Sequence, residues 1–270
     1  MLVEIILIHI FIFIFGTLIG SFTNVLIYRL PKHENFVTEA SHCMSCGHRL
    51  KWYDLVPLFS WLFLGGKCRY CKTKISGQYP LVEAANGIGY VLIFLVGGHD
   101  SLTSILYCIL CCLCFSILLT ISIIDARTYE IPVGLNIAIG ILGIIHLIIY
   151  ITLDVGPERV SIYEHFYDYL IGAVCVSGFL LILFIVTGGR GIGGGDIKLM
   201  AAAGLLLGWK HIIPALMFGA ILGSIIHIIL MKVSDKDRKL AFGPYLSAGI
   251  VIMILIGDRL IDWYTALIWG

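Results

Sequence analysis

The sequence predicts an all-α polytopic membrane protein of about eight transmembrane helices, with one small polar loop that carries four cysteines. Of its 270 residues, 59% are hydrophobic and only 13% are charged, and the mean hydropathy is +0.99. Soluble domains typically have about 45–50% apolar and about 25% charged residues, so this composition indicates an integral membrane protein. Long apolar runs recur along the chain, and two C-x-x-C pairs stand in its only sizeable polar segment.

Eight apolar runs are candidates for transmembrane helices. In chain order they cover residues 2–27, 81–96, 104–124, 132–153, 169–187, 199–207, 212–231 and 243–261. The first run lacks a basic start and a small-residue cleavage site, so we expect a retained helix rather than a signal peptide. A spanning helix needs roughly 20 apolar residues, and the run 199–207 is short. We expect it to begin inside the glycine-rich stretch before it; if it only dips into the membrane, seven helices span.

The basic residues predict the orientation of these helices. With eight helices, fifteen of the eighteen Lys and Arg residues fall on one side of the membrane. They comprise eight residues from Arg29 to Lys74, then Arg127, Arg190 and Lys198, and four residues within 232–239. Because basic loops favour the cytoplasm, we expect this side to be cytoplasmic and both chain ends to lie outside. The net charge of +1 gives no information about nucleic-acid binding, but the chain has no basic tail, and we expect no nucleic-acid partner.

The polar loop at 31–80 is too small for a deep core and requires another source of stability. Its cysteine pairs, Cys43 with Cys46 and Cys68 with Cys71, are separated by twenty-one residues. This spacing is typical of a structural zinc site in which each pair approaches one ion from a tight turn. The alternative is a pair of redox dithiols, which a cytoplasmic location and the absence of a βαβ pattern disfavour.

A glycine-rich stretch at 188–198 organises the second half of the chain. Six glycines fall in the eight residues before Asp196, and the run 104–124 is followed by Asp125. The eight-helix topology places both aspartates at cytoplasmic helix ends, where they are either functional acids or ordinary surface acids, with Asp196 as a helix N-cap. If the two carboxylates are close, one holds a proton while the other activates water, as in aspartic proteases. A glycine-rich wall then lets an extended peptide lie alongside.

An ordered set of motifs covers almost the whole chain. They are GSFTNVLIYRLP at 20–31, the two cysteine pairs, GKCRYC at 66–71, YPLVE at 79–83, ID at 124–125 with IP at 131–132, GGGDIK at 193–198 and FGPYL at 242–246. In this set the chain resembles the bacterial type IV prepilin peptidases, polytopic aspartic proteases of the GxGD type. Val133 stands where that family often has an acid, and Met44 where it often has proline. Neither departure touches a proposed catalytic or metal-binding atom.

The resemblance implies that Asp125 and Asp196 form the catalytic pair, and it divides the chain into a first helix (1–30), a zinc loop (31–80) and a peptidase region (81–270). We expect Gly193, Gly194, Gly195 and Lys198 to face the substrate. The Lys198 side chain either lowers the proton affinity of the neighbouring acid or extends towards the lipid headgroups, and we favour the second role.

The resemblance also implies the reaction and its surroundings. The substrates would be prepilins and pseudopilins in the plasma membrane bilayer, cut after a glycine on the cytoplasmic side. The cysteine loop is characteristic of members that also methylate the new amino terminus with S-adenosylmethionine. We find no glycine-rich methyl-donor signature within a Rossmann-like unit. The acids Glu34, Glu39 and Asp54 are expected to be solvated charges or to meet the basic leader.

Two other classes of protein share some of these features. A polytopic secondary transporter also has interrupted helices and acids in the membrane, but no convincing repeat of two halves is visible here. A membrane assembly scaffold could use a zinc loop to bind partners. Substitution of each aspartate by asparagine separates these classes from a protease.

Overall fold

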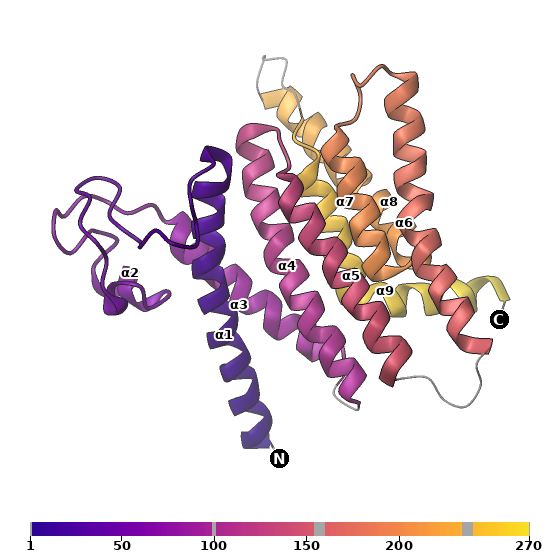
Figure 1. The fold of residues 1–270 in the computed structure, drawn as a ribbon, viewed down its shortest axis with the longest axis horizontal. Helices are drawn as coiled ribbons and strands as arrows, with labels where there is room; N and C mark the ends of the chain where they lie inside the picture. The colour runs from indigo at the N-terminus through magenta and orange to yellow at the C-terminus, as the bar shows by residue number, and fades with distance from the viewer. Residues whose placement is uncertain (1, 99–100, 154–159, 234–239, 270) are drawn as a thin grey trace. The chain divides into compact units, whose positions relative to one another are not determined.

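The computed structural model describes residues 2–98, 101–153, 160–233 and 240–269. The chain forms two compact units, Met1–Leu95 and Val96–Gly270. Figure 1 shows that the described residues of both units are built from helices and connecting segments.

The first unit contains two long helices and the polar loop between them. They are α1 (Leu2–Arg29) and α3 (Gln78–Val96); the loop carries the short turns η1 (Leu30–Lys32) and η2 (Trp52–Asp54) and the helix α2 (Phe59–Phe63). The side-chain amide of Asn86 donates to the backbone oxygen of Gly16 at 2.8 Å. A Cβ atom on Gly16 would lie 2.8 Å from Cα of Gly87, so glycine lets the two helices approach closely here.

In the part of the chain that the structure describes, the second unit is a bundle of six helices. They are α4 (Leu102–Thr128), α5 (Val133–Leu153), α6 (Val160–Val186), α7 (Gly194–Leu207), α8 (Trp209–Val233) and α9 (Gly243–Trp269). Successive helices run in alternating directions, which brings the ends of α4, α6 and α8 to the same end of the bundle as the starts of α5, α7 and α9 (Figure 1). The short helix α7 lies inside and contacts α5, α6, α8 and α9.

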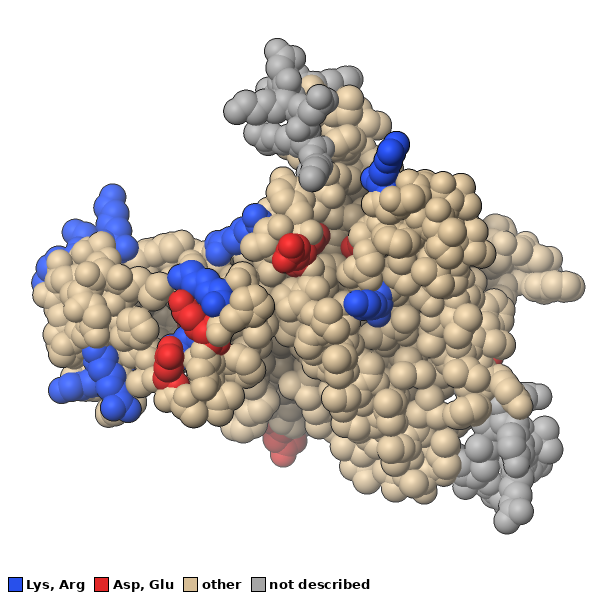
Figure 2. All heavy atoms as spheres, turned by 45° about the horizontal axis from the view of Figure 1, so that its top comes forward, with Lys and Arg blue, Asp and Glu red and all other residues tan. Residues whose placement is uncertain are grey.

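The helices confirm a multi-pass membrane protein. Within the described residues, seven helices are long and apolar enough to cross a membrane. The expected count of about eight is reached with α7, whose 14 residues are shorter than an ordinary span. As expected, α7 begins inside the glycine-rich stretch, at Gly194. In Figure 2, charged side chains gather over the polar loop of the first unit, whereas most of the visible surface of the second unit is uncharged.

The predicted orientation depends partly on residues that lie outside the described ranges. Arg159 and the basic residues of 234–239 are among them. The assignment of the cytoplasmic side therefore remains a prediction from charge counting.

The end of the second unit where α8 begins carries a small polar cluster. The indole of Trp209 donates to Oδ1 of Asp168 at 2.8 Å, and Nε2 of His211 lies 3.0 Å from Oδ1 of Asp258. These groups line a cavity of about 270 Å³ directly after the last residue of α7. The polar side chains at this end of the second unit come from α6, α8 and α9.

Candidate functional site

The first candidate site is the cysteine loop of the first unit, where two nearly identical turns present the four thiols. In each turn a backbone N–H four residues on donates to the carbonyl of the first cysteine, at 2.8 Å for Gly47 to Cys43 and 3.0 Å for Lys72 to Cys68. Gly47 and Lys72 both adopt positive φ, 69° and 60°. Glycine adopts this left-handed conformation without strain at position 47, and Lys72 adopts it although it carries a side chain.

The turns bring all four sulfur atoms together. The sulfurs of Cys43, Cys46, Cys68 and Cys71 lie within 4.8 Å of one another, and those of Cys43 and Cys71 are 3.8 Å apart. Four thiolates at about 2.3 Å from a tetrahedral ion would be about 3.8 Å apart, so the cluster fits a metal ion. Hydrogen bonds with the side chain and backbone of Thr73 lower the pKa of the Cys71 thiol, whereas burial and the thiols of Cys43 and Cys71 raise the pKa of Cys46.

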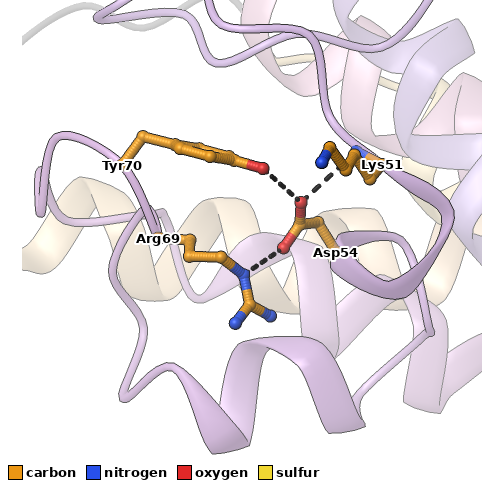
Figure 3. Close-up of polar contacts among 4 residues, drawn as sticks. All are labelled: Lys51, Asp54, Arg69 and Tyr70. Carbon is orange, nitrogen blue, oxygen red and sulfur yellow. Dashed lines mark hydrogen bonds and ion pairs between the residues drawn. The ribbon is translucent and has the colours of Figure 1, made fainter.

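An ion pair fixes the second turn to the rest of the loop. Nε of Arg69 donates to Oδ1 of Asp54 at 2.6 Å, and Oδ2 of Asp54 accepts from the backbone N–H of Lys51 at 3.3 Å and from the hydroxyl of Tyr70 at 3.5 Å (Figure 3). The Asp54 side chain is only 3% exposed. Burial opposes its charge, but the hydrogen bonds from Arg69 and Lys51 outweigh that effect and lower the pKa of Asp54. The expectation that Asp54 is a solvated charge is therefore wrong.

The second candidate site is the end of the second unit that holds the two aspartates. Asp125 lies in the last turn of α4 and Asp196 in the first turn of α7, and they are only 5% and 8% exposed. Helix α4 ends because Tyr129 turns to φ 58° and its N–H bonds to the carbonyl of Asp125 at 2.8 Å. The N-cap of α7 is Gly193 and not Asp196, but the Asp196 side chain still caps the helix, because it accepts from the backbone N–H of Gly193. Asp196 is the third residue of that helix.

Each carboxylate is held by a glycine backbone N–H. Gly243, the first residue of α9, donates to Oδ2 of Asp125 at 2.9 Å, and Gly193 donates to Oδ2 of Asp196 at 3.2 Å. A Cβ atom on Gly243 would lie 2.7 Å from Oδ2 of Asp125, so only glycine allows this contact without displacing the carboxylate. The second oxygen of each carboxylate accepts no hydrogen bond that the described residues supply.

The two aspartate segments also contact each other. The side-chain amide of Asn136 donates to the backbone carbonyl of Gly195 at 3.3 Å. A Cβ atom added to Gly195 would lie 3.0 Å from the Cβ atom of Ile131. The residues that follow Asp125 in sequence therefore pack against the residue that precedes Asp196.

The structure places the four residues expected to face a substrate at the same end. Gly193 and Gly194 are exposed, Gly195 is half-buried against Ile131, and Lys198 is exposed on the next turn of α7. Sequence reasoning assigned no role to Asn136 or Gly243. The FGPYL motif was a signal for Gly243, but nothing in the sequence showed that its N–H reaches the carboxylate of Asp125 from 118 residues away.

Comparison with known proteins shows similarity along both units. Residues 14–96 match the bacterial peptidase A24 N-terminal domain, and residues 112–228 match the type IV leader peptidase family. A protein of Pseudomonas aeruginosa named "Prepilin leader peptidase/N-methyltransferase" is 33% identical, over 92% of this chain and 90% of its own length. Proteins with the same name in Xanthomonas campestris (31%; 92% and 91%) and Bacillus subtilis (29%; 96% and 98%) are also similar. No solved structure matches the chain with significance.

Proposed function

This chain belongs to the prepilin leader peptidase/N-methyltransferase family, and on that premise we propose that it cleaves the leader peptide from prepilins and pseudopilins and then methylates the new amino terminus. The observation that carries the peptidase part is the pair of buried carboxylates at one end of the second unit, each held by a glycine N–H. The chain is thus proposed to be a membrane endopeptidase with a second, methyl-transferring activity.

In the proposed cleavage, Asp125 and Asp196 flank the scissile peptide bond. One carboxylate takes a proton from a water molecule, which attacks the carbonyl carbon; the other, protonated, donates to the carbonyl oxygen and later to the leaving amine. The N–H groups of Gly243 and Gly193 occupy one oxygen of each carboxylate and leave the other available for this chemistry. The exposed Gly193 and Gly194 offer no side chain that would obstruct an extended peptide.

The substrate is proposed to enter with its apolar stem among the helices and its basic leader in the cytoplasm. This places the cleavage point after the leader's glycine at the membrane surface, at the depth of the two aspartates. The proposal rests on charge counting, which puts the ends of α4 and α6 on the cytoplasmic side and both chain ends outside.

Zinc is the metal that we propose for the cysteine cluster. Cys43, Cys46, Cys68 and Cys71 would complete a tetrahedral shell, which leaves no open position for catalysis. The ion would hold the two turns of the polar loop together, and S-adenosylmethionine would supply the methyl group in the second reaction. We assign the peptidase to the region 81–270 and associate the loop 31–80 with the methyltransferase.

Separate Asp125→Asn and Asp196→Asn variants test the proposed catalytic pair. Purified protein in detergent is mixed with a prepilin, and we expect each variant to lose cleavage by at least about a hundredfold, because asparagine cannot transfer a proton in this role. Glu130→Gln is the matched control, since Glu130 is an exposed acid near the same helix end. If either asparagine variant cleaves at the wild-type rate, the pair is wrongly assigned.

The same experiment separates the protease from the other two classes of protein. A transporter or an assembly scaffold would show no cleavage of a prepilin by the wild type. Cleavage that requires both aspartates would exclude them as the primary function.

A further inference from the structure

The first unit encloses a cavity that the peptidase chemistry does not use. Its volume is about 370 Å³, and it lies where the polar loop covers the adjoining parts of α1 and α3. Pockets for small organic ligands usually have volumes of about 300–1,000 Å³, so a compound of nucleoside size fits. The whole lining belongs to residues 21–83, within the segment that matches the A24 N-terminal domain.

Two charged side chains in the lining are buried without a counter-ion. Arg29 is 8% exposed, and its guanidinium donates to the backbone oxygens of Asn35, Glu39 and Ala40 at 2.9–3.4 Å. A guanidinium has five N–H donors, so these three contacts leave two free for a ligand. No carboxylate among the described residues forms an ion pair with it. Buried charges are normally paired, so Arg29 is suited to hold an anionic group.

Glu83 is the opposite case, a buried carboxylate to which no described Lys or Arg residue forms an ion pair. It is 7% exposed and accepts from the backbone N–H of Leu58 at 2.8 Å. Leu58, which provides this N–H, has a φ angle of 61°, and leucine rarely adopts a positive φ. Glu83 therefore holds a strained turn at the cavity wall, and its charge is suited to a cationic group of a ligand.

Aromatic rings complete the lining. Tyr28 and Tyr79 stack with their centroids 5.3 Å apart, and the indole of Trp61 donates to the backbone oxygen of Ile75 at 3.2 Å, which fixes the ring. A Cβ atom on Gly66 would lie 2.8 Å from this indole, so the backbone packs directly on it. These three aromatic residues give this part of the lining an apolar, aromatic character that suits a nucleobase.

We propose that this cavity binds the methyl donor, S-adenosylmethionine. That molecule combines a carboxylate for Arg29, cationic ammonium and sulfonium groups for Glu83, and an adenine for the aromatic rings. This inference rests on the proposed methyl transfer and assigns its donor site to the first unit. In the transfer, the neutral amine of the cleaved pilin, having lost a proton to water, attacks the methyl carbon. The C–S bond breaks, its electron pair stays on sulfur as a neutral thioether, and the positive charge passes to the methylated nitrogen.

Binding of tritiated S-adenosylmethionine by the purified full-length protein tests the proposal. Val25 lines the cavity from α1, so Val25→Trp fills it and should weaken binding at least tenfold. Leu18→Trp is the matched control, because Leu18 is a 50% exposed residue of the same helix outside the cavity lining, and its binding should equal that of the wild type. Glu83→Gln keeps an oxygen for the N–H of Leu58 but removes the charge, and it should weaken binding about tenfold.

Prepilin cleavage and metal content, measured on the same samples, separate the possible outcomes. Retained metal with weakened binding in Val25→Trp and Glu83→Gln supports the donor site, whether or not the wild type cleaves. A wild type that cleaves but does not bind the donor, or variants that bind within twofold of the wild type, overturn the donor site and leave the peptidase proposal intact. A wild type that binds the donor without cleaving a prepilin overturns the peptidase proposal alone.

Discussion

The cysteine cluster and the aspartate pair are both assembled from two half-sites, but the half-sites are built differently. The cysteine half-sites repeat one local structure, a tight turn closed by its own backbone hydrogen bonds. The aspartate half-sites differ: Asp125 ends one helix and Asp196 begins another, and a third helix supplies the N–H of Gly243. A local site depends on its turns and its ion, whereas a distributed site depends on the packing of several helices.

We expect the largest decrease in cleavage from a substitution that disturbs the aspartate pair without replacing either aspartate. Gly243→Ala would place a methyl group 2.7 Å from the Asp125 carboxylate, and misplacing a reacting group by about 1 Å can cost about a hundredfold in rate. We expect prepilin cleavage to fall by about that factor while the protein stays folded. Gly134→Ala is the control, because a Cβ atom there meets nothing within 4 Å. Equal rates for the two variants would show that Gly243 does not position Asp125.

Removing the metal should affect the local site alone. The double variant Cys43→Ser/Cys46→Ser deletes one half-site, and elemental analysis should find about one zinc ion per wild-type chain and almost none in the variant. Cys175→Ser, outside the cluster, should keep its zinc. Unchanged zinc content in the double variant would refute the site. Complete loss of cleavage together with the zinc would show that the two regions are not independent.

A smaller effect is expected from the ion pair that supports the second cysteine turn. Asp54→Asn removes a buried charge that accepts from Arg69 at 2.6 Å, and hydrogen bonds to charged groups contribute about 1.5–3 kcal/mol. We expect zinc to be extracted at a lower chelator concentration than from the wild type. Glu39→Gln is the control, since Glu39 is exposed in the same loop. If both variants release zinc at the wild-type concentration, Asp54 does not stabilise the turn.

The smallest effect is expected at Lys198. Its side chain is exposed two residues beyond Asp196, and exposed charges usually contribute less than about 1 kcal/mol. Lys198→Gln should therefore change the cleavage rate by less than about fivefold, with the effect shrinking at high salt. A decrease comparable to that of Gly243→Ala would mean that Lys198 contacts the substrate directly.

The same comparison explains what the sequence was able to predict. The cysteine cluster follows from spacing, because a C-x-x-C pair forms its own turn. The shared location of Asp125 and Asp196 follows from helix alternation, and the start of α7 among glycines was expected from the length of the apolar run. The hydrogen-bond partners of these acids could not be predicted from the sequence, because the contact of Gly243 with Asp125 depends on how α4 and α9 pack. The burial of Asp54 and the missing counter-ion of Arg29 likewise depend on the folded loop.

The length of α7 has a consequence for the surrounding bilayer. Its 14 residues rise about 21 Å, whereas the hydrocarbon layer is about 30 Å thick. If Asp196 lies at one membrane face, as we propose, the other end of α7 stops well short of the opposite face, and the polar side chains of Trp209, Lys210 and His211 begin there. Lipid tails cannot solvate these groups, so the bilayer must be thinner around this part of the protein, or water must reach into it. The protein would then alter the shape of the membrane from which it draws its substrates.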